Sequence, residues 1–256
     1  MKLFLLNGGR IDVDRAVIRP GDDSHRRVSL PCMQVLIEQR RARLLVDTGM
    51  PAAGAGDELG LKRAYGMDPA WIKPVMSVEN RADRQLHQLG LQPADLDLVI
   101  NTHLHFDHAG GNPLFVGVTV AVQQEEIEAA ATDNYLPVWD APGLQFQSVE
   151  GDWSPVPGVD MMFTPGHTPG HQSMLVRFEN ARPWLFTWDA VCTQEHWISQ
   201  DLGATADVRR ARASLTRLRE VAADEKAKLI FGHDMAQWEA LGMDQSGGPR
   251  LVASDE

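Results

Sequence analysis

Residues 103–108 of the chain read HLHFDH, and the rest of the sequence is interpreted outward from this run. Within six residues it places three imidazoles and one carboxylate, on His103, His105, Asp107 and His108. Burying these groups together without a metal ion would carry a large desolvation cost. A regular strand would point successive side chains to opposite faces, so a tight loop is needed to aim all four inward. We therefore predict a metal site on a loop.

The segments around this run extend the predicted site. Residues 96–100 are predicted to form a buried strand, so the run lies on the loop leaving a strand, where α/β proteins commonly hold ligands. Three further candidate ligands each follow an apolar, strand-like segment, namely His167, Asp189 and His233. Seven ligands are too many for one tetrahedral ion but suit two ions about 3.5 to 4 Å apart that share a carboxylate. We expect two divalent ions, with zinc preferred and iron, cobalt or manganese as alternatives.

The remaining pattern predicts an α/β or α+β protein in which residues 1–256 form one domain. Residues 14–31 lack periodicity and are predicted to be a long surface loop. Residues 51–80 are predicted to be irregular, with one short helix. Helical spacing predicts helices at 80–89, 124–131 and 208–223. Short apolar runs predict strands at 2–6, 35–38, 42–46, 96–100, 118–122, 160–164, 174–178, 184–187 and 229–231.

The composition excludes several classes of protein. The chain is 43% hydrophobic and 23% charged, as is usual for a folded globular protein. Its formal net charge of −11 argues against a nucleic-acid partner. It has no run of about 20 apolar residues, so we expect no membrane association. Its two cysteines, Cys32 and Cys192, lie far apart, which argues against a disulfide framework and fits a reducing cytoplasm. Monomer and homodimer both remain open.

The run at 103–108 matches the H-x-H-x-D-H motif of the metallo-β-lactamase superfamily, which the chain resembles over most of its length. The resemblance extends to the turn at 47–49 and to the later ligand candidates, in order and spacing. It implies an αββα sandwich of two mixed β-sheets flanked by helices. It also implies that His103, His105 and His167 hold one metal, that Asp107, His108 and His233 hold the other, that Asp189 bridges them, and that Asp47 orients a ligand histidine.

The other histidines are not needed for this set. We interpret His25, His87 and His196 as structural. His171, on the same loop as His167, is left open between a role in supporting a ligand and a place on the surface.

Particular positions narrow the resemblance. True β-lactamases of the superfamily carry a cysteine at the bridging position, so Asp189 points away from them. The compact length, Phe106 and the ending at 232–234 resemble N-acyl homoserine lactonases and 4-pyridoxolactonase. Those lactonases carry a tyrosine three residues after the bridging aspartate, where this chain has Cys192, and often a glycine before it, where this chain has Trp188. We expect Phe106, Trp188 and Cys192 to line the substrate pocket, which Trp188 would narrow or reshape.

The resemblance implies a dinuclear hydrolase that opens a lactone, either an N-acyl homoserine lactone, as in quorum quenching, or a related small lactone. Metal coordination would lower the pKa of a bound water from about 15.7 to about 7, so no separate base is required. Asp107 or Asp189 would then carry a proton to the leaving group. Two alternatives remain: a thioester hydrolase similar to glyoxalase II, and a non-catalytic metal-binding protein on the same scaffold.

Overall fold

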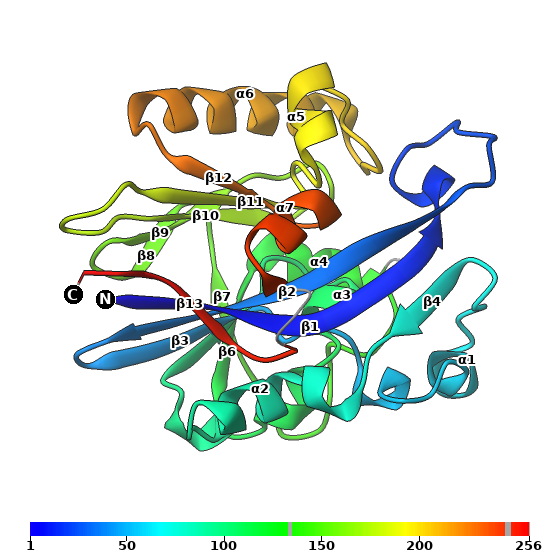
Figure 1. Ribbon diagram of the computed structural model, residues 1–256, viewed down its shortest axis with the longest axis horizontal. Helices are drawn as coiled ribbons and strands as arrows, with labels where there is room; N and C mark the ends of the chain where they lie inside the picture. The colour runs from blue at the N-terminus through cyan, green and yellow to red at the C-terminus, as the bar shows by residue number, and fades with distance from the viewer. Residues whose placement is uncertain (133–134, 244–246, 256) are drawn as a thin grey trace.

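Two facing β-sheets form the centre of the computed structural model, which describes residues 1–132, 135–243 and 247–255 (Figure 1). The first sheet has the strand order β13-β1-β2-β3-β5-β6-β7, with β4 paired to β1. β1, β2 and β3 pair antiparallel, whereas β3, β5, β6 and β7 pair parallel. Its strands are β1 (Lys2–Asp14), β2 (Arg27–Gln39), β3 (Ala42–Val46), β4 (Ile72–Val75), β5 (Leu98–Ile100), β6 (Thr119–Gln123), β7 (Gln145–Val149) and β13 (Arg250–Ser254).

The second sheet has the order β12-β11-β10-β9-β8. Strands β8 to β11 pair antiparallel, and β12 joins β11 in parallel, so this sheet is mixed as well. Its strands are β8 (Trp153–Val156), β9 (Val159–Phe163), β10 (Gln172–Val176), β11 (Trp184–Trp188) and β12 (Lys228–Phe231).

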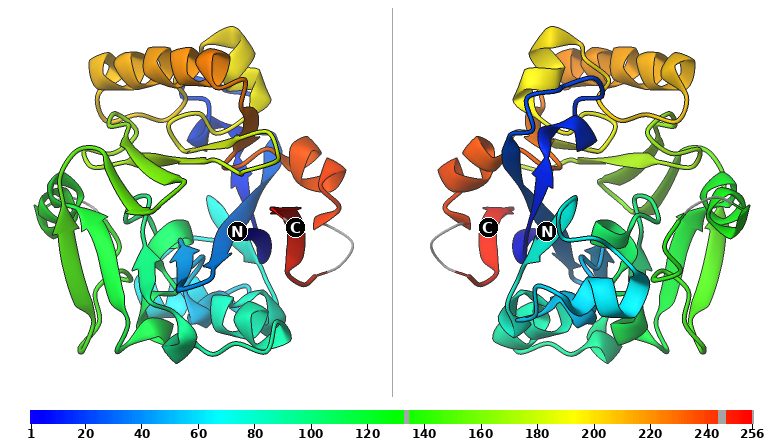
Figure 2. Two further views of the ribbon diagram at one scale, coloured as in Figure 1. Left: turned by 90° about the vertical axis from the view of Figure 1, so that its left-hand side faces the viewer. Right: turned by 90° about the vertical axis from the view of Figure 1, so that its right-hand side faces the viewer.

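Helices cover the outer faces of both sheets, as the two side views show (Figure 2). Leu215 and Leu218 of α6 pack onto the second sheet, and Leu86 of α2 packs onto the first. This arrangement confirms the αββα sandwich. No helix among the described residues has both the length and the apolar character needed to cross a membrane. The helices are α1 (Gly60–Tyr65), α2 (Ala82–Gln88), α3 (Phe106–Ala109), α4 (Gln124–Thr132), α5 (Gln194–Ser199), α6 (Val208–Asp224) and α7 (Met235–Ala240).

The main core lies between the sheets and follows the alternation of strand side chains. On β2, Met33, Val35 and Ile37 face the second sheet, while Leu36 faces the helix layer around α2. Since helices cover the outer face too, β2 is buried on both sides from residue 30 to residue 37. Full burial of each such side chain stabilises the fold by about 1.5 to 3 kcal/mol. This core holds the strands in place, and the loops extend from the strand ends.

Most predicted elements are confirmed with small shifts in their bounds. The helix predicted at 208–223 is α6, and the one predicted at 80–89 is α2. Gly90, after α2, has a φ of +77°, the left-handed conformation expected of a glycine that ends a helix. Strands β4, β7, β8 and β13 and helices α3, α5 and α7 were not predicted; α3 lies where a loop was expected at 103–108.

The long loop predicted at 14–31 is wrong in part. β1 continues to Asp14 and pairs with β2 from Arg27 onward, so only residues 15–26 lie between the two strands. Ile11 and Val13 alternate here with charged residues, as in a strand with one exposed face, so the sequence carries a strand signal that the prediction of a loop from residue 14 and a strand ending at residue 6 missed.

Candidate metal centre

The predicted ligands lie on the segments that follow parallel strands: most are on loops, and Asp107 and His108 are in the short helix α3. β3 and β5 are parallel neighbours in the first sheet and lead to Asp47 and residues 103–108. β11 and β12 are parallel neighbours in the second sheet and lead to Asp189 and His233. β9 runs the same way as β11, because both pair antiparallel with β10, and it leads to His167. The site therefore forms at one edge of the sandwich, where these strand ends meet.

The run at 103–108 is held by a close approach of two backbone segments. It enters the four-residue helix α3, followed by Gly110 and Gly111. A Cβ at Gly110 would lie 2.4 Å from Pro51, and one at Gly111 would lie 2.2 Å from the carbonyl oxygen of Thr48. Only glycine lets the ligand loop pack this tightly against the turn after β3.

Three histidines form the first ligand group. Nε2 of His103 and Nε2 of His167 each lie 3.1 Å from Nδ1 of His105. The Nδ1 of His167 is 2.8 Å from the carbonyl oxygen of Ala204, which can only accept, so Nδ1 carries the proton. The lone pair of Nε2 is thereby directed toward the other two rings, as metal binding requires.

A carboxylate and two histidines form the second group. Nε2 of His108 and Nε2 of His233 both lie 3.6 Å from Oδ2 of Asp107. His233 donates from Nδ1 to the carbonyl oxygen of Pro31 at 2.9 Å, so its Nε2 lone pair also faces inward. The ligand atoms of this group lie within 4.8 Å of one another, as do those of the first group.

Asp189 stands between the two groups and faces both. Its Oδ1 lies 3.3 Å from Nε2 of His108 and 3.2 Å from Nε2 of His233. Its Oδ2 lies 3.3 Å from Nε2 of His167 in the first group. One carboxylate with an oxygen toward each group is the arrangement that a bridging ligand needs.

The electrostatics of the site fit two bound cations. Burial, followed by neighbouring histidines, holds the pKa of His103 and His105 well below 6.5, so both rings are neutral. Burial alone would raise the pKa of Asp189, but His233, His108 and His167 lower it well below its usual value. Buried Nε2 of His108 and Oδ1 of Asp189 lie 3.3 Å apart, but neither makes a hydrogen bond of good geometry within the described residues. Such orphaned atoms are costly unless a cation engages them, so the donor set fits divalent metals.

Asp47 makes the contact that its predicted role requires. Its Oδ2 accepts from Nδ1 of His108 at 2.8 Å and from the hydroxyl of Thr102 at 2.8 Å, and its Oδ1 accepts from the Thr102 N–H at 2.8 Å. Burial raises the pKa of Asp47. A buried carboxylate that accepts from His108 leaves the Nε2 of that ring free as a ligand.

His171 is fully buried, which excludes a place on the surface. Its Nε2 accepts the Asp189 N–H at 3.2 Å, and its Nδ1 bonds the hydroxyl of Thr164 at 3.0 Å. Burial lowers the pKa of His171 to about 3, so the ring stays neutral. Its place four residues after His167 was the only sequence signal for this contact with Asp189. His196 is buried elsewhere, and His25 and His87 are exposed.

A cavity of about 270 Å³ opens directly onto the two groups. Phe106 and Cys192, which we expected to line the substrate pocket, line this cavity beside candidate ligands of both groups. The rest of its wall is aliphatic: Ile11, Val17, Ile18, Leu30, Ile72 and Ala204.

The prediction that Trp188 narrows this cavity is wrong. Its indole is fully buried in the core between the sheets, 5.4 Å from the ring of Phe186. Trp184, Phe186 and Trp188 alternate along β11 and share its inner face, so the tryptophan points away from the loop that carries Asp189. Its φ of +43° marks the sharp turn that redirects the chain at this point.

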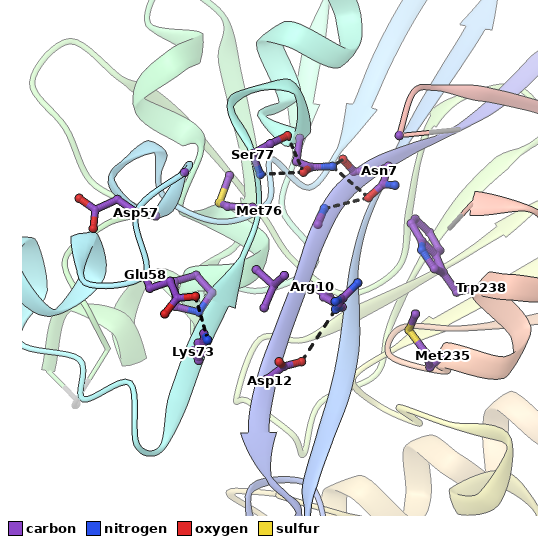
Figure 3. Close-up of a pocket in the computed structure, with 17 residues that line it drawn as sticks. Asn7, Arg10, Asp12, Asp57, Glu58, Lys73, Met76, Ser77, Met235 and Trp238 are labelled. Atoms are coloured by element: carbon purple, nitrogen blue, oxygen red, sulfur yellow. Dashed lines mark hydrogen bonds and ion pairs between the residues drawn. The ribbon is translucent and has the colours of Figure 1, made fainter. Parts of the chain in front are cut away.

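A larger cavity, of about 690 Å³, lies elsewhere and contains none of the seven candidate ligands (Figure 3). Its lining charges are partnered: Lys73 is 2.9 Å from Glu58, and Arg10 is 3.9 Å from Asp12. Cavity volume alone would therefore point to the wrong place for the active site, because the candidate ligands line the smaller cavity.

Known proteins resemble the chain along most of its length. A family model described as the metallo-beta-lactamase superfamily matches residues 28–233. An N-acyl homoserine lactonase from Bacillus sp is 38% identical over 237 residues, covering 92% of this chain and 94% of that protein. The N-acyl homoserine lactonase AttM from Rhizobium radiobacter is 32% identical, covering 93% and 95%. A solved structure of N-acyl homoserine lactone hydrolase, with the product N-hexanoyl-L-homoserine bound at the catalytic metal center, matches with a TM-score of 0.87 and 36% identity, covering 93% and 95%.

Proposed function

The chain belongs to the metallo-β-lactamase superfamily, and we propose that it is a dinuclear metal-dependent hydrolase that opens the lactone ring of N-acyl homoserine lactones. One observation carries the proposal: Asp189 has an oxygen facing each of the two candidate ligand groups, which open onto an aliphatic cavity. The relatives named above act on such lactones, and this chain spans 94% of the Bacillus enzyme.

We propose that both ions are zinc, since imidazole and carboxylate ligands without thiolate favour it, and iron, cobalt or manganese suit similar sets. When bound, the ions supply Lewis acidity and make hydroxide available from water near neutral pH. The first ion would be held by His103, His105 and His167, the second by Asp107, His108 and His233, with Asp189 shared.

The chain itself would supply orientation and proton transfer. Water adds across the lactone C–O bond: its oxygen bonds to the carbonyl carbon, one of its protons goes to the ring oxygen, which leaves as an alcohol, and the resulting carboxylic acid releases the other proton to solvent. Asp107 and Asp189 both line the cavity, and we propose that one of them takes a proton from the attacking water and returns it to the ring oxygen. The aliphatic wall would hold the acyl chain and exclude bulk water.

Cys192 stands where the lactonases that the chain resembles carry tyrosine. Its buried thiol donates to the backbone carbonyl of Asp189 at 3.7 Å. Burial, reinforced by Asp189 and Asp107, raises the pKa of this thiol well above 9.0, which makes it a poor nucleophile. Cys32 is buried and unpaired as well, which fits the cytoplasmic location we propose.

Ring opening of a lactone panel tests the proposal. Metal-loaded protein should open short-chain and long-chain N-acyl homoserine lactones, and His108→Ala should lose this activity because it removes a ligand of the second group. If every lactone survives while S-lactoylglutathione is cleaved, the protein is a thioester hydrolase. If neither substrate reacts although two ions are bound, the scaffold only binds metal.

A further inference from the structure

Glu126 connects the two loops that carry the first ligand group, although it is not itself a ligand. It lies in the first turn of α4, and its side chain is fully buried. Oε1 accepts the N–H of Leu104 at 2.9 Å, and Oε2 accepts the N–H of Gly170 at 2.9 Å. Leu104 lies between His103 and His105, and Gly170 follows His167 by three residues.

The contact is close enough to require glycine on the second loop. A Cβ at Gly170 would lie 2.4 Å from both the Cβ and the backbone nitrogen of Glu126. The backbone of α4 and the loop after β9 therefore touch directly, and the carboxyl group of Glu126 reaches past this contact to the other loop.

The environment of Glu126 explains how a carboxyl group can be buried here. A buried carboxyl group is costly unless its oxygens are hydrogen-bonded. Both oxygens of Glu126 accept a backbone N–H, and the first turn of a helix favours negative charge. The two loops thus supply the donors that the carboxyl group needs, and the carboxyl group holds the two loops together.

A backbone bond links the same segments. The N–H of Gln172 donates to the carbonyl oxygen of Thr102 at 2.9 Å. The bonds of Glu126 add a second link between these segments, and one of them is at Leu104, which neighbours both His103 and His105.

We propose that Glu126 is a positioning residue, which holds the loop of His103 and His105 against the loop of His167 at the separation that the first metal ion requires. The inference rests on the proposed metal centre and is independent of the substrate. Glu126 acts only through the backbone of Leu104 and Gly170.

Glu126→Gln tests the proposal, with Glu128→Gln as the control. Glutamine keeps the shape of the side chain, but its NH₂ group would face one of the two N–H donors, so one hydrogen bond is lost. Glu128 lies on the exposed side of the same helix. We expect chelator competition to release one of the two ions from the Glu126→Gln holoprotein at about 10-fold to 100-fold weaker affinity. The affinity for the other ion, and both affinities of the Glu128→Gln control, should equal those of the unmodified protein. The absorption spectrum of the cobalt-loaded protein should change only in Glu126→Gln.

The outcomes separate this inference from the proposed function. If the unmodified protein binds fewer than two ions, the metal centre itself is wrong. If Glu126→Gln keeps both affinities and the cobalt spectrum but melts at a lower temperature, Glu126 is only structural and the inference is overturned.

A measurement on the unmodified holoprotein keeps the inference testable should Glu126→Gln fail to fold. The amides of Leu104 and Gly170 should exchange hydrogen at least about tenfold more slowly than the amide of the exposed Gly21. Exchange as fast as that of Gly21 would mean that the two bonds are not held, which overturns the inference.

Discussion

Asp47→Asn should weaken the second metal ion while leaving the fold in place. Asparagine has the same shape, and its carbonyl oxygen can still accept the Thr102 N–H that Asp47 binds at 2.8 Å. The NH₂ group then replaces the oxygen that accepts from Nδ1 of His108 at 2.8 Å. The ring must lose that bond or move its proton to Nε2, which is the ligand atom.

The size of the effect follows from the bond that is lost. A hydrogen bond to a charged group contributes about 1.5 to 3 kcal/mol, which is roughly a 10-fold to 100-fold change in an equilibrium constant. Loss of a residue that supports a metal ligand generally costs the same range in affinity. We therefore expect the ion held by Asp107, His108 and His233 to bind about 10-fold to 100-fold more weakly, and excess zinc to restore much of the lactonase activity.

Chelator competition on the metal-loaded protein measures this affinity directly, and kcat/KM at low and high zinc measures its consequence. Asp97→Asn is the matched control, because Asp97 is exposed and also accepts a backbone N–H, from Arg43 at 2.8 Å, away from the ligand groups. Retention of both ions with unchanged affinity in Asp47→Asn would refute the reasoning that His108 is oriented by this carboxylate.

Three further predictions follow from the cavity wall and the surface charges. Ile72→Trp adds bulk to the 270 Å³ cavity, so KM for long-chain lactones should rise at least about tenfold with little change for short chains; an equal rise for both would contradict an acyl-chain site. Cys192→Ala should change kcat/KM by less than about tenfold, because the weak bond of a protonated thiol contributes about 1 kcal/mol or less; a larger loss in steady-state assays would give the thiol a chemical role. Burial by itself would raise the pKa of Asp152, but hydrogen bonds from Arg217 and the Phe163 N–H hold this pKa below 3.8. The stabilising effect of the Asp152 carboxylate is therefore present above pH 3.8 and is lost as the pH falls through its lower pKa in the folded protein. Urea unfolding of Asp152→Asn should show a free energy of unfolding that is lower by at most about 1 kcal/mol near neutral pH, and this difference should disappear in acid. A difference that persists in acid would contradict this assignment.

The sequence alone was enough to predict the chemistry of the site. The residue types that hold metal ions are few, and four of them fall within the run at 103–108, which is too dense to be structural. The strands and helices flanking the ligands have strong apolar periods, so α6 and most strands near the site were also predictable. The candidate ligands could be found from local sequence because the segments that carry them are short and directly follow the strands.

Only the tertiary structure decided how the site is supported and what it faces. The cavity wall combines residues of β1, β2, β4 and the loop at 15–26, none of which carries a metal-site signal. Glu126 and His171 act through backbone groups far away in the chain, and a hydrogen bond to a distant N–H leaves no mark in the local sequence. Trp188 is adjacent to a ligand in sequence but points into the core, because strand alternation and not sequence proximity sets the direction of a side chain.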